Sequence, residues 1–237
     1  KTPGVYIIEK NAFPNSVVEV ATAIPAFIGH TQFARDGNKD LTDIPFRISS
    51  MAEFHSFFGF APTLRFGIRP EDSESEDTTN DINVLFPDGS CQLTLPKTFY
   101  ALYYNMLLFY ANGGGPCYIV SVGDYEHDFK SIDFTNALLA LKKEQEPTLV
   151  VVPEAVYMEE GDCYKVQTAA LMHCGNDMKN RFAILDVFNG YKDENGAVIK
   201  SFRENIGSNF LAYCASYYPW INTSIVTEKD ITFYNIE

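Results

Sequence analysis

The sequence lacks any long hydrophobic run. No window of its 237 residues approaches the roughly 18 uncharged apolar residues that a membrane-spanning helix needs, so no membrane insertion is expected. Its first residues show neither the basic nor the apolar stretch of a secretion signal. Basic residues are scarce, because 18 Lys and Arg face 31 Asp and Glu, a net charge of −13. Nucleic acid would repel such a chain, so nucleic-acid binding is not expected.

Motifs for metal binding and covalent catalysis are also missing. The sequence contains no CxxC pair, no HxH or HExxH pattern and no GxSxG elbow. The five cysteines are spread along the chain, several of them in apolar runs: Cys91, Cys117, Cys163, Cys174 and Cys214. This usage is typical of reduced thiols in a protein made in the cytosol. We therefore predict no catalytic residues, no metal and no cofactor.

The glycine cluster at residues 112–116 does not match a phosphate-binding loop. Such loops follow a strand and open a helix, whereas this cluster follows a helical pattern and precedes a strand. The Walker lysine is absent, so a helix C-cap with a tight turn is favoured. Asp124 and Asp186 follow predicted strands, where α/β enzymes place functional groups. Neither has a recognisably spaced histidine or serine, which favours hydrogen bonding to a loop over catalysis.

Residues 61–96 break the regular pattern and are predicted to form an insertion or a long exposed loop. Residues 71–81 carry six carboxylates and no cation, which is typical of a solvated surface loop. A calcium loop is the alternative, but the ligand spacing and turn glycine of an EF-hand are missing. Residues 84–86 and 91–95 are predicted to form a hairpin around a turn at 86–90.

Outside this insertion, strand and helix patterns alternate. The predicted strands are residues 26–30, 117–122, 148–152, 182–187 and 210–218, the last of which is alternatively helical. The predicted helices are residues 51–58 with a Ser50-x-x-Glu53 capping box, 97–111, 134–143, 163–175 and 201–206. Apolar strands joined by helices predict a three-layer α/β/α sandwich with a mostly parallel, doubly wound sheet.

The first 22 residues are predicted to form an extended arm. Residues 5–8 and 16–20 are rich in β-forming side chains, and Pro14 separates them. They have no helical period and no partner strand one tight turn away. One interpretation is a strand donated to a neighbouring subunit, and the other is an edge strand on the chain's own sheet. Spacing alone does not choose between them.

An aromatic run near the end of the sequence is the other candidate interaction site. It contains Tyr213, Tyr217, Tyr218 and Trp220. Tyrosine and tryptophan are enriched among interface anchors, which makes Tyr217, Tyr218 and Trp220 candidate interface residues. The alternative is a core strand whose tyrosine hydroxyls reach the surface.

Several segments carry a resemblance to one family. Residues 2–6 (TPGVY) and 20–31 (VATAIPAFIGHT) closely resemble the start of contractile tail sheath proteins, which occur in contractile phage tails and in phage-like injection systems. Five further segments resemble the family in family order: residues 45–59, 109–122, 146–153, 181–187 and 213–225. The resemblance covers most of the chain outside residues 61–96.

The resemblance implies a structural role without catalysis. Sheath subunits stack in helical rings around an inner tube, and arms that add strands to a neighbour's sheet link the rings. A baseplate signal starts contraction, which drives the tube through a target envelope. The implied linking residues lie in the arm, residues 1–22, ahead of an α/β body at 23–237: Thr2, Pro3, Gly4, Val5, Tyr6, Ile7, Ile8, Val17, Val18 and Val20.

The implied partners are other copies of the chain, an inner tube protein, and baseplate and terminator or cap proteins. The implied location is a particle assembled in the bacterial cytoplasm, either a phage tail or an injection system that can be released. The usual carboxy-terminal sheath region has no match, and residues 230–236 are predicted to be a strand. The alternative function is an α/β enzyme or nucleotide-binding protein with a pocket near Asp124, Pro153 and Asp186.

Overall fold

The computed structural model describes residues 23–70, 81–86, 89–94, 98–192 and 196–236. The predicted linking residues of the arm, and the acidic block except Asp81, lie outside the described residues. No helix in the described ranges is long and apolar enough to cross a bilayer.

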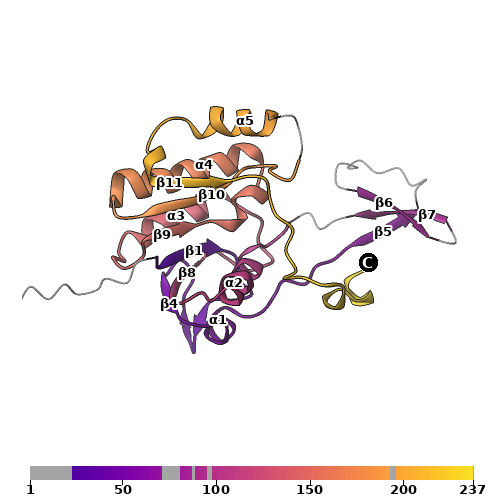
Figure 1. The fold of residues 1–237 in the computed structure, drawn as a ribbon. Helices are drawn as coiled ribbons and strands as arrows, with labels where there is room; N and C mark the ends of the chain where they lie inside the picture. The colour runs from indigo at the N-terminus through magenta and orange to yellow at the C-terminus, as the bar shows by residue number, and fades with distance from the viewer. Residues whose placement is uncertain (1–22, 71–80, 87–88, 95–97, 193–195, 237) are drawn as a thin grey trace, which may run out of the picture.

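The body is built on a six-stranded sheet with the order β11-β10-β9-β1-β8-β4 (Figure 1). Its five parallel strands are β1 (Pro25–Gly29), β8 (Cys117–Ser121), β9 (Leu149–Val151), β10 (Phe182–Asp186) and β11 (Cys214–Tyr217). The edge strand β4 (Phe46–Ile48) runs antiparallel to β8. In chain order the parallel strands are arranged 2-1-3-4-5, a doubly wound order. The predicted mostly parallel sheet is confirmed.

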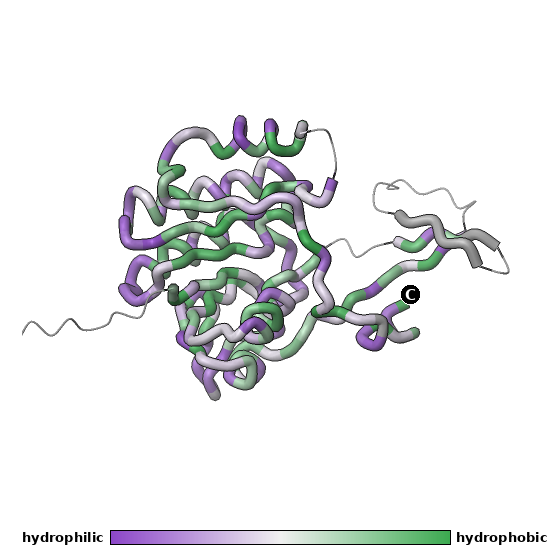
Figure 2. Tube along the Cα trace, viewed as in Figure 1, coloured by the Kyte–Doolittle hydropathy of each residue, from purple (hydrophilic) through white to green (hydrophobic). Residues whose placement is uncertain are grey.

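Helices cover both faces of the sheet and complete the predicted three layers. The helices α3 (Ser131–Leu141), α4 (Glu160–Met172) and α5 (Ala197–Ile206) enclose one core with alternate residues of the strands, such as Val150, Ala183 and Leu185. The helices α1 (Met51–Phe58) and α2 (Leu102–Ala111) enclose a second core against Phe27 and Ile119. Figure 2 shows the central strands as predominantly hydrophobic. The central strands carry apolar side chains on both faces of the sheet because helices bury both of these faces.

The predicted start and stop of α1 are confirmed. The Ser50 hydroxyl accepts a hydrogen bond from the Glu53 N–H at 3.2 Å. The Glu53 carboxylate reaches one residue further than a capping box requires and accepts from the Ser49 N–H at 2.7 Å. Gly59 ends the helix with a φ of 85°, and a Cβ there would lie 2.5 Å from Gln32 Oε1. Glycine is therefore required at this stop.

The helix α2 corrects the predicted range of 97–111, because it begins at Leu102. Its N-cap Ala101 provides no side-chain cap, and the Leu102 N–H donates instead to the carboxylate of Glu154. This cap comes from a distant part of the chain, so no local pattern reveals it. Its nearly continuous apolar sequence predicts a well-buried helix, yet only Leu102 and Met106 are buried along the described helix.

The remaining helical segments also differ in extent from the prediction, and α3 occupies Ser131–Leu141 instead of residues 134–143. The helix α4 starts at Glu160, before the predicted residue 163, and continues into the π-helix η2 (His173–Met178). The helix α5 starts at Ala197 instead of residue 201. Residues 210–218 contain both predicted alternatives, because the 3-10 turn η3 (Leu211–Tyr213) leads directly into β11.

The insertion forms a separate antiparallel sheet of β5 (Gly67–Pro70), β7 (Gly89–Thr94) and β6 (Asp81–Phe86), in that order (Figure 1). The β6–β7 hairpin confirms the prediction, whereas β5 was not predicted. Three other short strands were also not predicted. They are β2 (Arg35–Asp36), which pairs with β3 (Lys39–Asp40), and the edge strand β4.

The predicted strand at residues 230–236 is wrong. The structure has two 3-10 turns there, η4 (Glu228–Asp230) and η5 (Phe233–Asn235). Capping boxes at Thr227 and Thr232 stabilise these turns. Their local hydrogen bonds outweigh the preference of the β-branched and aromatic residues for a strand. The Phe66 N–H donates to the Asn235 carbonyl at 2.7 Å, so the tail is attached to the start of the insertion.

Candidate interaction surfaces

A groove of about 650 Å³ lies at the carboxyl ends of β9, β10 and β11. We name it the aromatic groove. Its lining consists of Phe99, Ala101, Tyr104, Asn105, Leu108, Pro153, Val156, Tyr157, Asp186, Thr223, Ile225, Val226 and residues 217–221. The short 3-10 helix η1 (Pro153–Tyr157), the exposed side of α2 and the segment after β11 supply most of these residues.

The three predicted interface residues all line the aromatic groove. Tyr217 is 61% exposed and Tyr218 is 36% exposed, whereas Trp220 is half-buried. Tyr213 packs partly buried against the main core, as the core-strand alternative predicted for this run. The same run therefore supplies one core side chain and three groove side chains.

Trp220 is held rigidly at the wall of the groove. Its indole Nε1–H donates to the Val187 carbonyl at 2.9 Å, and its main-chain N–H donates to the Gly190 carbonyl at 3.0 Å. Its ring centroid lies 5.9 Å from that of Tyr157 and 5.2 Å from that of Tyr191. A Cβ on Gly190 would lie 2.5 Å from the indole nitrogen, so only glycine permits this arrangement.

Asp186, the last residue of β10, is the sole charged residue among the described residues that line this groove. No hydrogen bond or ion pair to its carboxylate is found in the described ranges, and only its main-chain carbonyl is bonded, by Gln167. Asp186 is nevertheless exposed to solvent, and the partial exclusion of water by neighbouring groups raises the pKa of its carboxyl.

Asp124 lies elsewhere, in the loop after β8, and the expectation that it has no histidine partner is wrong. His127 Nδ1 lies 2.5 Å from Asp124 Oδ1, and both side chains are largely exposed. The Glu126 N–H donates to the same oxygen at 2.9 Å, and this bond contributes most to lowering the pKa of Asp124. No serine or cysteine hydroxyl or thiol joins the pair in the described residues. The pair therefore closes a loop, as the non-catalytic interpretation predicted.

The point where the strand order reverses, between β1 and β9, is where doubly wound proteins usually bind ligands. Here it is filled by a buried pair, His30 and Glu154, whose Nδ1 and Oε2 atoms lie 2.8 Å apart. Glu154 Oε2 also accepts from the His30 N–H at 2.9 Å, and Oε1 accepts from the Leu102 N–H at 3.3 Å. A Cβ on Gly29 would lie 2.9 Å from that of Leu102, so no room remains.

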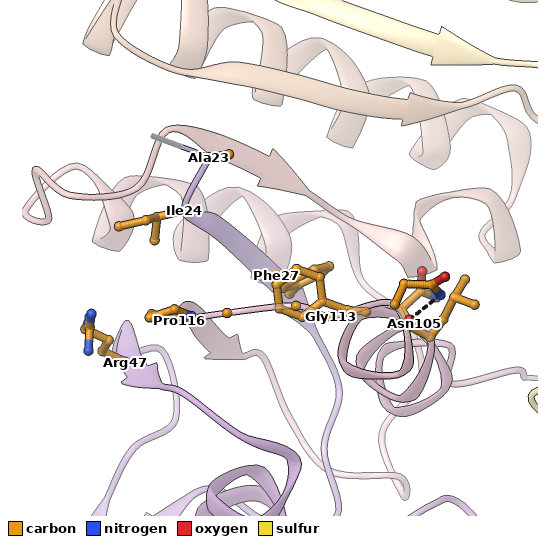
Figure 3. Close-up of a pocket in the computed structure, with 12 residues that line it drawn as sticks. Ala23, Ile24, Phe27, Arg47, Asn105, Gly113 and Pro116 are labelled. Carbon is orange, nitrogen blue, oxygen red and sulfur yellow. Dashed lines mark hydrogen bonds between the residues drawn. The ribbon is translucent and has the colours of Figure 1, made fainter. Parts of the chain in front are cut away.

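A second groove, of about 660 Å³, lies beside the start of β1 (Figure 3). We name it the arm-root groove, because Ala23 and Ile24, which follow the predicted arm, line it. The rest of its lining is Phe27, Arg47, Asn105, Leu108, Phe109 and residues 112–116. The glycine cluster here has the predicted role: Gly113 has a φ of 83°, and the Gly114 N–H donates to the Phe109 carbonyl after the end of α2.

Both grooves share Asn105 and Leu108, so they border the same stretch of α2. The nearby sheet face is only partly covered. Leu149, Val151, Phe182 and Ile184 are partly exposed, although their neighbours along β9 and β10 are buried by α3 and α4. The outer edges of β11 and β4 pair with no other strand in the described ranges. These two grooves and two sheet edges are candidate surfaces for contact with other chains.

No group of three or more potential metal ligands occurs in the part of the chain that the structure describes. No protein-family model matches the sequence. No curated protein matches it significantly either.

Proposed function

We propose that this chain is a structural subunit of a contractile tail sheath. Copies stack in helical rings around an inner tube. Baseplate proteins lie at one end of the stack and cap proteins at the other. Contraction drives the tube through a target envelope. The energy for contraction is the difference in free energy between two packing arrangements of the same subunits. Assembly takes place in the bacterial cytoplasm, and the product is a phage tail or an injection-system particle.

The segments that carry the resemblance support this proposal by their position in the fold. Residues 20–31, 109–122, 146–153, 181–187 and 213–225 contain β1, β8, β9, β10 and β11, respectively. They therefore include each of the parallel strands, and residues 45–59 contain α1. Similarity in core strands supports a shared fold, and the arm motif at residues 2–6 is what connects it with sheath proteins.

The observation that carries the proposal is the place where the arm joins the body. Residues 1–22 lead into β1, which lies between β8 and β9 at the centre of the sheet. The Ile24 carbonyl accepts from the N–H groups of Thr148 and Leu149, and the Ile24 N–H donates to the Thr148 hydroxyl at 3.0 Å. A pull on the arm therefore shears two hydrogen-bonded ladders at once instead of peeling off an edge strand. This attachment suits a segment that links moving subunits.

Deletion of residues 1–20 tests the proposal. The arm-deleted chain is expected to fold as a monomer with an unchanged circular dichroism spectrum, because both cores lie within the described body. When it is produced together with its tube protein, electron microscopy should show no sheath. A matched chain with residues 1–20 replaced by a Gly-Ser segment of equal length should fail in the same way. Normal sheaths from either variant would refute the proposal.

One observation favours the alternative of an α/β enzyme or nucleotide-binding protein. The aromatic groove contains Pro153 and Asp186, two of the three residues around which the pocket was predicted. Asp124 lies outside it, and the strand-order reversal point is filled by His30 and Glu154. A thermal-shift screen against nucleotides and metal ions separates the two functions, because a bound ligand raises the unfolding temperature. Stabilisation would favour the enzyme, and a flat screen would favour the sheath subunit.

A further inference from the structure

We propose that the aromatic groove is a docking site for a partner polypeptide that inserts an arginine side chain against Asp186. This inference does not depend on the sheath function, since it concerns the chemistry of the groove alone. It identifies the kind of residue that a partner must present.

Charge complementarity points to a cationic occupant. Asp186 is the sole charged residue among the described lining residues, and no Lys or Arg lines the groove to neutralise it. Asp186 is exposed at the groove, its carboxylate has no hydrogen-bond partner in the described ranges, and the other described lining residues are uncharged. The carboxylate is therefore accessible to a partner. A cation that enters the groove pairs with it beside aromatic and aliphatic side chains, where the attraction between opposite charges is stronger than in open water.

The aromatic rings select arginine among the possible cations. A planar guanidinium stacks on the faces of tyrosine and tryptophan and binds a carboxylate with two parallel hydrogen bonds. A metal ion would need several oxygen, nitrogen or sulfur ligands. Asp186 is the only carboxylate among the described lining residues, and no group of three potential metal ligands occurs in the described ranges. Lysine provides a point charge without the planar surface, so it fits this set of rings less well.

The size and rigidity of the groove indicate a polypeptide instead of a free small cation. Its volume of about 650 Å³ exceeds what one guanidinium fills, and it extends past apolar residues such as Leu108, Val156 and Ile225. Trp220 is fixed by its two hydrogen bonds, so the wall is formed before a partner arrives. Tyr217 and Ile221, which is 79% exposed, are placed at the surface as anchors for flanking apolar side chains.

Trp220 is the only tryptophan of the chain, so its fluorescence reports directly on the groove. The probe is the peptide acetyl-Leu-Arg-Leu-amide, titrated into the full chain and compared with the same peptide containing citrulline, an uncharged analogue of arginine. We expect the arginine peptide to change Trp220 emission with a Kd of about 1 mM or below, and the citrulline peptide to bind at least about tenfold more weakly.

Asp186→Asn should abolish the preference for arginine over citrulline, because it removes the charge and keeps the side-chain shape. The matched control is Glu126→Gln, an exposed carboxylate outside the groove, which should leave the preference unchanged. Equal binding of both peptides to the unmodified chain, or no change in emission up to about 10 mM, would overturn the proposal. Equal binding of acetyl-arginine-amide would show a small-cation site, and equal binding of a lysine peptide would show no selection of arginine. Either result would also overturn it.

Discussion

Glu154→Ala is expected to lower the free energy of unfolding by about 3–5 kcal/mol. The Glu154 side chain is completely buried and joins three elements. It pairs with the His30 ring, accepts from the His30 N–H and caps the first turn of α2 through Leu102. Alanine leaves these buried donors without a partner and opens a cavity, and each effect destabilises the fold.

The pair behaves as a unit because its two members compensate for each other's burial. Burial raises the pKa of Glu154, while the hydrogen bond and charge of His30 act in the opposite direction. Removal of one member therefore lowers the free energy of unfolding strongly, because the other member stays buried without a partner. Replacement of both members by apolar residues of the same size would lower it less. Since small domains are stable by about 5–15 kcal/mol, the variant is expected to lose a large part of its stability.

Urea unfolding followed by circular dichroism measures this effect. Glu154→Gln keeps the volume and one accepting oxygen, so it should be less destabilising than Glu154→Ala. The control is Glu146→Ala, whose carboxylate is 40% exposed and bonds to Arg47 and Tyr118. It should cost about 1 kcal/mol or less. A loss of similar size for Glu146→Ala and Glu154→Ala would contradict the assigned role of the buried pair.

The second large effect is a loss of stability as the pH falls, caused by His173. This side chain is buried, and its Nε2 lies 2.8 Å from Nη1 of Arg181. Burial, together with repulsion from Arg181, lowers the pKa of His173 from 6.5 to about 4. Arg181 also donates to the carbonyls of Leu141 and Glu144, so it connects η2 to the end of α3. Neutral His173 accepts a hydrogen bond from this arginine, and protonated His173 cannot.

Between pH 6.5 and about 4 the unfolded chain binds a proton at His173 that the folded chain does not. The contribution of this group to stability is therefore complete above pH 6.5 and is lost as the pH falls to about 4, by up to about 3 kcal/mol. His173→Gln keeps an accepting oxygen without titrating, so it should flatten this part of the profile. His127→Gln, at an exposed histidine, should not. Parallel profiles for the unmodified chain and His173→Gln would contradict this prediction.

The parallel strands could be predicted because burial on both faces makes them continuous apolar runs between Pro, Gly and polar residues. Residues 26–30 and 117–122 differ from β1 and β8 by a residue at one end or at each end. The strand β4 could not be predicted from the sequence, because its three residues form a strand only by pairing with β8. The predicted strand at residues 230–236 failed because two local capping boxes favour turns over extended backbone.

The candidate surfaces were predictable only where neighbours in sequence remain neighbours in space. Tyr217, Tyr218 and Trp220 were found because one aromatic run carries them. The pairing of His30 with Glu154 was missed because 124 residues separate them. Asp186 was noted at its strand end, yet the groove that it shares with Trp220 and Tyr157 depends on the path of the chain after β11. The His127 partner of Asp124 was missed although its spacing of three residues was visible.

The central claim is that the first segment of each chain pairs with another copy. A photo-reactive benzoylphenylalanine in place of Tyr6 tests it most directly. Equal amounts of ¹⁵N-labelled and unlabelled chains are assembled together and irradiated, and the crosslinked peptides are analysed by mass spectrometry. We predict crosslinked pairs of mixed label, which form only between different copies. Crosslinks confined to peptides of a single label would place the segment on its own body and contradict the account.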